Sequence, residues 1–136
     1  MFYFSQTSSK RLSTCDPRLQ KLFNEVIKTI DCTIACGFRN RDEQEKMYNK
    51  GLSQKKWPDS KHNQRPSLAV DVYPYINNKM INGDYPKEVG QIKYFAGQVI
   101  QIARYLEIPI IWGGDWNNDG NTINNGFNDL GHYELI

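Results

Sequence analysis

Apolar side chains recur at helical spacing in two segments of the chain. The first segment begins at Asp16-Pro17, where an N-cap residue precedes a proline at the first helical position. Its apolar positions are Leu19, Leu22, Phe23, Val26, Ile27 and Ile30. The second segment follows Pro86 and keeps the same spacing over about five turns, with apolar positions Val89, Ile92, Phe95, Ala96, Val99, Ile100, Ala103 and Leu106. Each stripe predicts a helix with one buried face.

Short apolar runs predict buried strands at residues 32–38, 68–72 and 108–112. Pro74 is expected to interrupt the strand ladder, and Asn77-Asn78 to form the turn of a small hairpin through Met80 and Ile81. Strands mixed with helices in this order predict an α+β fold. We expect a small antiparallel sheet with helices packed mainly on one face.

A further helix is predicted between Asn40 and Gly51. Asn40 is a good N-cap, Glu43 completes a capping-box pattern, and Gly51 ends the segment. Met47 and Tyr48 are expected to pack inward from this helix. Residues 1–15 are polar and show no period, which predicts an arm or a short loop.

Composition limits the classes of function that need to be considered. The chain of 136 residues has 39% hydrophobic and 24% charged residues, which is typical of one globular domain over residues 1–136. A net charge of +2 is too small to indicate nucleic acid as a partner. The sequence has neither a run of apolar residues for a membrane segment nor a basic start for a signal peptide. We expect a monomer whose cysteines, Cys15, Cys32 and Cys36, are reduced and mostly buried.

The chain has only two histidines, and each has an aspartate near it in sequence. A catalytic zinc site uses three protein ligands of the imidazole, carboxylate or thiolate type, and His62, Asp71 and His132 would supply such a set. A bend at Leu130-Gly131 would turn Asp129 toward the same point, close enough to water to act as a general base. On spacing alone, the alternative is a set of unrelated surface residues.

Four motifs in this order resemble the zinc peptidases of the D-Ala-D-Ala carboxypeptidase and VanY type. They are Ser60-Lys61-His62, Ala69-Val70-Asp71, Trp112-Gly113-Gly114-Asp115-Trp116 and Asp129-x-x-His132. Within that group the sequence is most similar to phage endolysins that act as L-alanyl-D-glutamate endopeptidases. The resemblance runs from about Gly37 to the C-terminus.

The resemblance implies a role for each matching residue. Zinc would be bound by His62, Asp71 and His132, and Asp129 would be the catalytic acid and base, a position where the family often has glutamate. Arg39 matches the arginine that helps hold the substrate and its developing oxyanion. The implied fold is the hedgehog/D-Ala-D-Ala peptidase-like fold.

The implied function is hydrolysis of an amide bond in the peptidoglycan stem peptide, between L-Ala and D-Glu, by a zinc-dependent endolysin. The alternatives are a D-Ala-D-Ala carboxypeptidase and a non-catalytic zinc-containing binding domain, because fold does not settle function. A component of the phage particle is a further alternative. We expect synthesis in the host cytoplasm, a holin-type route to the cell wall, and no separate wall-binding domain.

Two polar loops have two interpretations each. The segment 52–67 contains Lys55, Lys56, Trp57, Lys61 and Arg65, and forms either a rim for an anionic wall polymer or a solvated loop. The loop after Trp112 has oxygen donors at the spacing that opens a calcium loop, namely Asp115, Asn117, Asp119 and Asn121. Gly126 stands where such a loop has glutamate, so an Asn/Asp/Gly-rich turn is the alternative to calcium.

Overall fold

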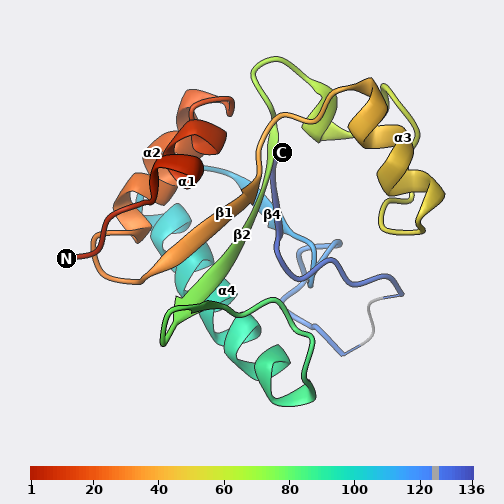
Figure 1. Cartoon of the computed structure of the whole chain (residues 1–136). Helices are drawn as coiled ribbons and strands as arrows, with labels where there is room; N and C mark the ends of the chain where they lie inside the picture. The colour runs from red at the N-terminus through yellow and green to blue at the C-terminus, as the bar shows by residue number, and fades with distance from the viewer. Residues whose placement is uncertain (124–125) are drawn as a thin grey trace.

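The computed structural model describes residues 1–123 and 126–136, which form four α-helices and five strands in an α+β fold (Figure 1). The elements in chain order are α1 (Gln6–Leu12), α2 (Pro17–Val26), β1 (Cys32–Cys36), α3 (Arg41–Asn49), the 3-10 turn η1 (Lys61–Asn63), β2 (Ala69–Ile76), β3 (Lys79–Met80), α4 (Pro86–Tyr105), β4 (Ile110–Trp112) and β5 (His132–Leu135). The predicted fold class is confirmed.

The sheet is antiparallel, with the strand order β1-β2-β5-β4 and with β3 paired to the far end of β2. Side chains alternate between the two faces of a strand. On β2 and β5 the side chains of one face are Val70, Val72, Tyr133 and Leu135, and all four belong to the hydrophobic core. The opposite face carries Asp71, Tyr73, His132 and Glu134, which line a cavity. The apolar pattern therefore fixes which side chains face away from the core.

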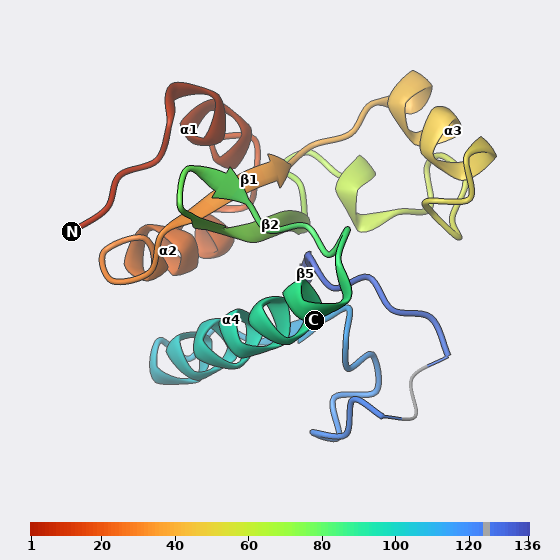
Figure 2. The same ribbon diagram turned by 60° about the horizontal axis from the view of Figure 1, so that its bottom comes forward.

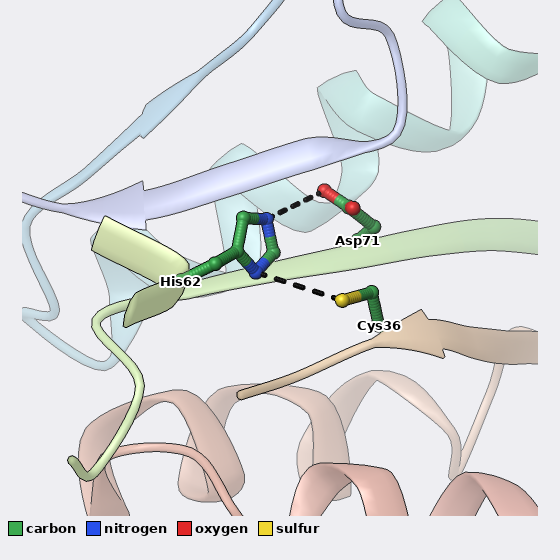
Figure 3. A group of neighbouring side chains, drawn as sticks. All are labelled: Cys36, His62 and Asp71. Atoms are coloured by element: carbon green, nitrogen blue, oxygen red, sulfur yellow. Dashed lines mark hydrogen bonds and ion pairs between the residues drawn. The ribbon is translucent and has the colours of Figure 1, made fainter. Parts of the chain in front are cut away.

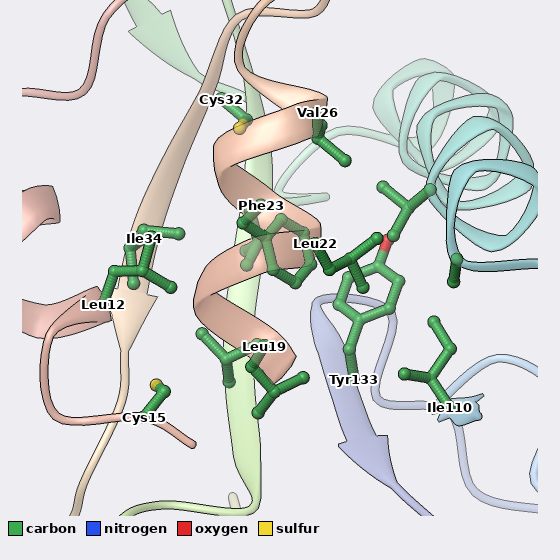
Figure 4. Packing of buried hydrophobic residues seen from close by; sticks show 14 of the residues in the cluster. Leu12, Cys15, Leu19, Leu22, Phe23, Val26, Cys32, Ile34, Ile110 and Tyr133 are labelled. Atoms are coloured by element: carbon green, nitrogen blue, oxygen red, sulfur yellow. The ribbon is translucent and has the colours of Figure 1, made fainter. Parts of the chain in front are cut away.

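The core lies between the apolar face of the sheet and helices α2 and α4. Figure 4 shows Leu19, Leu22 and Phe23 of α2 beside Tyr133 of β5, and the Phe23 and Tyr133 rings meet edge to face at 5.5 Å. Helix α4 contributes Phe95, Ala96, Val99 and Ala103 to the same core. Burying each large apolar side chain stabilises the fold by about 1.5–3 kcal/mol, so this layer holds the sheet in place.

Helix α3 lies apart from the other three helices in both ribbon views (Figures 1 and 2). Its predicted capping box is present, because Asn40 accepts a hydrogen bond from the Glu43 backbone and Glu43 accepts one from Asn40. The prediction that Tyr48 packs inward is wrong, since Tyr48 is 37% exposed. The side chain of α3 that is fully buried is Gln44.

Two other local predictions are wrong. Residues 6–12 form helix α1, in which Ser5 caps the Ser8 amide, and the Ser8 hydroxyl accepts a hydrogen bond from the backbone of Ile34. This helix is too short for apolar residues to show a helical period. Pro74 lies inside β2, opposite Cys32. Pro74 has no N–H to donate, but its carbonyl accepts the Ile81 amide at 2.9 Å, so the chain stays paired on both sides of the proline.

The hairpin between β2 and β3 is confirmed, and its turn residues Asn77 and Asn78 both have positive φ, at 52° and 62°. In the part of the chain that the structure describes, no helix combines the length and the apolar character needed to span a membrane.

Candidate metal centre and active site

His62 is held by the turn η1 rather than by the sheet. Ser60 begins this turn with its hydroxyl accepting the His62 amide at 3.2 Å, and the Asn63 side chain accepts the Ser60 amide at 3.1 Å. The His62 carbonyl accepts a hydrogen bond from the Arg39 backbone at 2.8 Å. These bonds fix a histidine that is only 2% exposed.

Three donor atoms from three segments converge next to the sheet. The Asp71 Oδ1 atom lies 3.1 Å from His62 Nε2 and 3.2 Å from His132 Nδ1, and the two ring nitrogens are 3.3 Å apart. Asp71 and His132 are brought together because they are direct partners in the β2–β5 register. His62 completes a nearly equilateral triangle from outside the sheet.

The remaining ring nitrogen of each histidine is held by an oxygen acceptor. His62 Nδ1 donates to the Gly37 carbonyl at 2.8 Å, and His132 Nε2 donates to Glu134 Oε1 at 2.8 Å. A carbonyl or a carboxylate only accepts hydrogen bonds, so each partner fixes the proton on the outer nitrogen. The inner nitrogens, which form the triangle with Asp71, are thereby the ones available as ligands.

Asp129 is placed beside this triangle by backbone hydrogen bonds. Its amide donates to the Gly113 carbonyl at 2.9 Å, and the Gly113 amide donates to the His132 carbonyl at 2.8 Å. A Cβ at Gly113 would lie 2.0 Å from the Asp129 carbonyl oxygen, so only glycine permits this approach. The bend expected at Leu130-Gly131 brings Asp129 Oδ2 to 3.8 Å from His132 Nδ1.

Arg39 reaches the same place from the end of β1. Its side chain is 7% exposed, and its Nη2 donates to Asp71 Oδ2 at 3.4 Å. The structure thus brings Arg39, His62, Asp71, Asp129 and His132 together, although they come from distant parts of the sequence.

A model of the family of phage L-alanyl-D-glutamate peptidases matches residues 1–136 of this chain. The chain belongs to this family. This result confirms the resemblance and the prediction of a peptidase. Among curated protein sequences, none is detectably similar to it.

The fold of the peptidase is also that of a solved enzyme. The L-Ala D-Glu endopeptidase ChiX of Serratia marcescens superimposes with a TM-score of 0.72 at 22% sequence identity, covering 98% of this chain and 90% of ChiX. At this identity the match establishes the shared fold alone.

Cys36 of the peptidase lies beside His62, which its sequence position did not suggest. Figure 3 shows His62 between Cys36 and Asp71, with the Cys36 Sγ atom 3.9 Å from Nδ1 and Asp71 on the side of Nε2. A bulge in β1 shifts the register between Ile34 and Cys36 and sets Cys36 opposite Asp71. Without this bulge Cys36 would point into the core, as Ile34 does. Cys36, His62, Asp71 and His132 are the candidate metal-binding residues.

The other two cysteines behave as expected from the sequence. Cys15 and Cys32 are free and buried, and burial raises the pKa of each thiol to about 12. They therefore stay protonated and take no part in the chemistry of the site.

The buried charges of the site shift one another's pKa. Burial lowers the pKa of His62, but the Asp71 carboxylate outweighs this effect and raises the pKa to about 10. For Asp71 burial acts to raise the pKa, and the two histidines overcome it and lower the pKa. Burial and the nearby Asp71 charge raise the pKa of Asp129. Metal binding by the two histidines should therefore depend on pH, because a bound ion competes with protons there.

Glu134 supports His132 from the same strand. Burial acts to raise the pKa of Glu134, but hydrogen bonding to His132 and to Lys61 lowers the pKa to about 2. The Lys61 Nζ atom lies 3.1 Å from Glu134 Oε2 and also donates to the Leu135 carbonyl. Glu134 is therefore an ionised carboxylate that orients the imidazole of His132.

The candidate residues open into a cavity of about 580 Å³. Its lining includes Tyr73, Trp116, Leu52 and Lys55 in addition to the residues already described. In the segment 52–67, Lys55 and Lys61 line this cavity. Lys56 lies over the Tyr48 ring, and both residues line a separate small pocket with Trp57. Part of this loop therefore forms the rim of the site.

In the loop after Trp112, side-chain oxygens accept hydrogen bonds from backbone amides of the same loop. The Asp115 carboxylate accepts the amides of Asp119 at 3.2 Å and Gly120 at 2.8 Å. Asp119 accepts the Asn121 amide at 2.8 Å, and Asn121 accepts the Ile123 amide at 2.9 Å. These bonds are those of the Asn/Asp/Gly-rich turn, and calcium binding stays a prediction.

Proposed function

We propose that this peptidase is a zinc enzyme that hydrolyses the amide bond between L-Ala and D-Glu in peptidoglycan stem peptides. Family membership supports the bond, the polymer and action at the bacterial cell wall. The observation that supports zinc is the triangle formed by His62 Nε2, Asp71 Oδ1 and His132 Nδ1.

The donor set and its spacing fit zinc. Histidine nitrogens and carboxylate oxygens bind zinc at about 2.0–2.2 Å, and four-coordinate sites are tetrahedral. Two donors at the corners of such a tetrahedron are about 3.3–3.6 Å apart. The three separations here are 3.1, 3.2 and 3.3 Å. The three donors would therefore need to move apart by only a few tenths of an ångström to hold the ion.

Zinc bound by these three residues would supply a Lewis acid that activates water and polarises the scissile carbonyl. The Asp129 carboxylate would take a proton from the attacking water at its Oδ2 atom and pass it to the leaving amine. A raised pKa suits a group that must both accept and release a proton. The guanidinium of Arg39 would stabilise the negative charge that develops on the carbonyl oxygen.

The test is mass spectrometry of purified peptidoglycan after digestion by the enzyme, with and without a zinc chelator. New termini between L-Ala and D-Glu that disappear with the chelator are expected. Loss of terminal D-Ala alone would instead establish a carboxypeptidase, and the absence of cleavage by the zinc-loaded protein would favour a binding domain.

Zinc content gives an independent check on the ligands. The wild-type protein should hold one zinc ion per chain by elemental analysis, and His62→Ala or His132→Ala should lose most of it. Asp84→Asn, which changes an exposed carboxylate in another loop, is the matched control and should keep full zinc content. Full zinc content in both histidine variants would contradict the proposed ligand set.

A further inference from the structure

Gln44 is a fully buried polar residue on a helix that has little other attachment to the protein. Helix α3, which the structure describes completely, has Gln44 as its buried side chain, and Met47 is only half-buried. A helix in a globular protein usually packs through a stripe of apolar residues. α3 lacks such a stripe, so the interactions of Gln44 decide how the helix is held.

The side-chain amide of Gln44 uses its whole hydrogen-bonding capacity. Its oxygen accepts from Arg39 Nη1 at 3.0 Å and from Asn63 Nδ2 at 3.1 Å. Its nitrogen donates to Ser53 Oγ at 2.9 Å and to the Lys55 carbonyl at 2.6 Å. A carboxamide offers two donors and accepts two hydrogen bonds. Because all four are used inside the protein, the orientation of the amide is fixed.

The partners of Gln44 belong to three parts of the active site. Arg39 contacts Asp71 through its other terminal nitrogen at 3.4 Å. Asn63 follows His62 directly and also donates to the Arg39 carbonyl at 3.0 Å. Ser53 and Lys55 line the cavity. One buried amide therefore joins the guanidinium, the turn that carries His62 and the cavity wall.

We propose that Gln44 is a positioning residue, which holds the Arg39 guanidinium toward the reacting carbonyl and keeps the Ser53–Lys55 wall at the distance that substrate binding requires. This inference rests on the proposed function for the role of Arg39. Gln44 itself does not touch the substrate. Gln44 should affect turnover by positioning Arg39, and it should affect substrate binding by positioning the Ser53–Lys55 side of the cavity.

A double-mutant cycle tests the effect of Gln44 on turnover through Arg39. Gln44→Met keeps the length of the side chain and removes all four hydrogen bonds, and a misplaced guanidinium should lower kcat by about 10-fold to 100-fold. In an Arg39→Ala background the same change should lower kcat by less than about 3-fold, because the group that it positions is already absent. Equal losses in the two backgrounds would overturn the proposal.

Gln44→Glu tests the effect of Gln44 on substrate binding through the Ser53–Lys55 side of the cavity. A carboxylate still accepts from Arg39 and Asn63, but it cannot donate to the Lys55 carbonyl. KM should therefore rise about 10-fold, while kcat stays within about 3-fold of wild type. A fall in kcat with unchanged KM would contradict this division of roles. Glu45→Gln, an exposed change on the same helix, is the matched control and should alter neither constant.

A measurement that needs no activity separates this proposal from the proposed function. In ¹⁵N-labelled wild-type protein, NMR should show hindered rotation of the Arg39 guanidinium and slow solvent exchange of the Gln44 side-chain amide. Gln44→Met should free the Arg39 guanidinium while zinc content stays at the wild-type level. If wild type fails to cleave peptidoglycan yet shows these signals, the function is wrong and the positioning by Gln44 stands. A freely rotating Arg39 in wild type would refute the positioning itself.

Discussion

Replacing Asp129 with asparagine should remove turnover without removing the site. The backbone of Asp129 makes hydrogen bonds to Gly113 and His132 that do not involve its side chain. An asparagine can therefore keep the same position. Within residues 1–123 and 126–136, the ion pair that the carboxylate makes is a long contact of 3.8 Å to His132 Nδ1. We therefore expect Asp129→Asn to fold and to bind zinc like wild type, and to be unable to accept a proton from water.

The expected loss follows from the step that Asp129 is proposed to perform. A positioned general base contributes about 10²-fold to 10⁴-fold to the rate, which corresponds to about 2.7–5.4 kcal/mol of transition-state stabilisation. Because a proton acceptor acts in the transition state more than in substrate binding, the loss should lie in kcat and leave KM nearly unchanged.

Although Asp129→Asn should lose activity, it should not lose thermal stability in the metal-free state. The folded protein raises the pKa of Asp129 above its value in the unfolded chain, through burial and the Asp71 charge. An acid with a raised pKa destabilises the folded state at any pH above its unfolded value, because the charged form is less favourable there. Asparagine carries no charge, so the metal-free variant should melt at the same temperature as wild type or higher at pH 7.

The assay combines release of free amino groups from peptidoglycan with thermal melting and zinc analysis. Asp84→Asn is the control for loss of an exposed carboxylate, and it should match wild type in all three measurements. If Asp129→Asn keeps activity within a few-fold of wild type, Asp129 is not the base. If it loses zinc together with activity, its role is that of a ligand.

Two further predictions concern pH and backbone packing. The pKa of His62 is raised to about 10 in the folded chain, so the proton on His62 stabilises the metal-free protein fully below pH 6.5 and this contribution is lost as pH rises toward 10. The melting temperature of chelator-treated protein should therefore fall between pH 6.5 and 10, and fall less in His62→Ala; a flat profile in wild type would contradict this. Gly113→Ala places a Cβ 2.0 Å from the Asp129 carbonyl oxygen and should reduce the free energy of unfolding by about 1–3 kcal/mol. Gly97→Ala in α4 meets no atom within 4 Å and should raise it by about 0.5–1 kcal/mol in the same denaturant titration.

The helices, the strands and the juxtaposition of the site residues were largely accessible from the sequence, because they depend on periodic patterns and on rare residue types. Val70 and Val72 alternate with polar residues, which identifies the core face of β2, whereas β5 (His132–Leu135) is not among the strands predicted from the sequence. Two histidines in the whole chain leave few ways to build a histidine site. The order of the motifs then indicated the family, which the family match confirms.

The features that sequence analysis missed depend on tertiary contacts rather than on a period. Cys36 turns toward His62 because of a single bulge in β1, and no local pattern marks that register shift. Gln44 stands in the polar sequence of α3, and its burial follows from partners outside this helix, 5 to 19 residues away in the chain. Helix α1 has one signal in the sequence, the capping serine Ser5, which is weak without an apolar stripe behind it.

The core of this peptidase also determines the geometry of its candidate metal centre. Asp71 and His132 face each other only in the observed register of β2 and β5. A slip of one residue would move Val70 and Tyr133 out of the core and Asp71 into it, so hydrophobic burial locks the two proposed ligands in place. The position of His62 does not depend on the strand register. It is held by the hydrogen bonds of the turn η1, in which Lys61 donates to the Leu135 carbonyl. Polar bonds are individually weak, so His62 should be the proposed ligand whose position depends most on a bound ion.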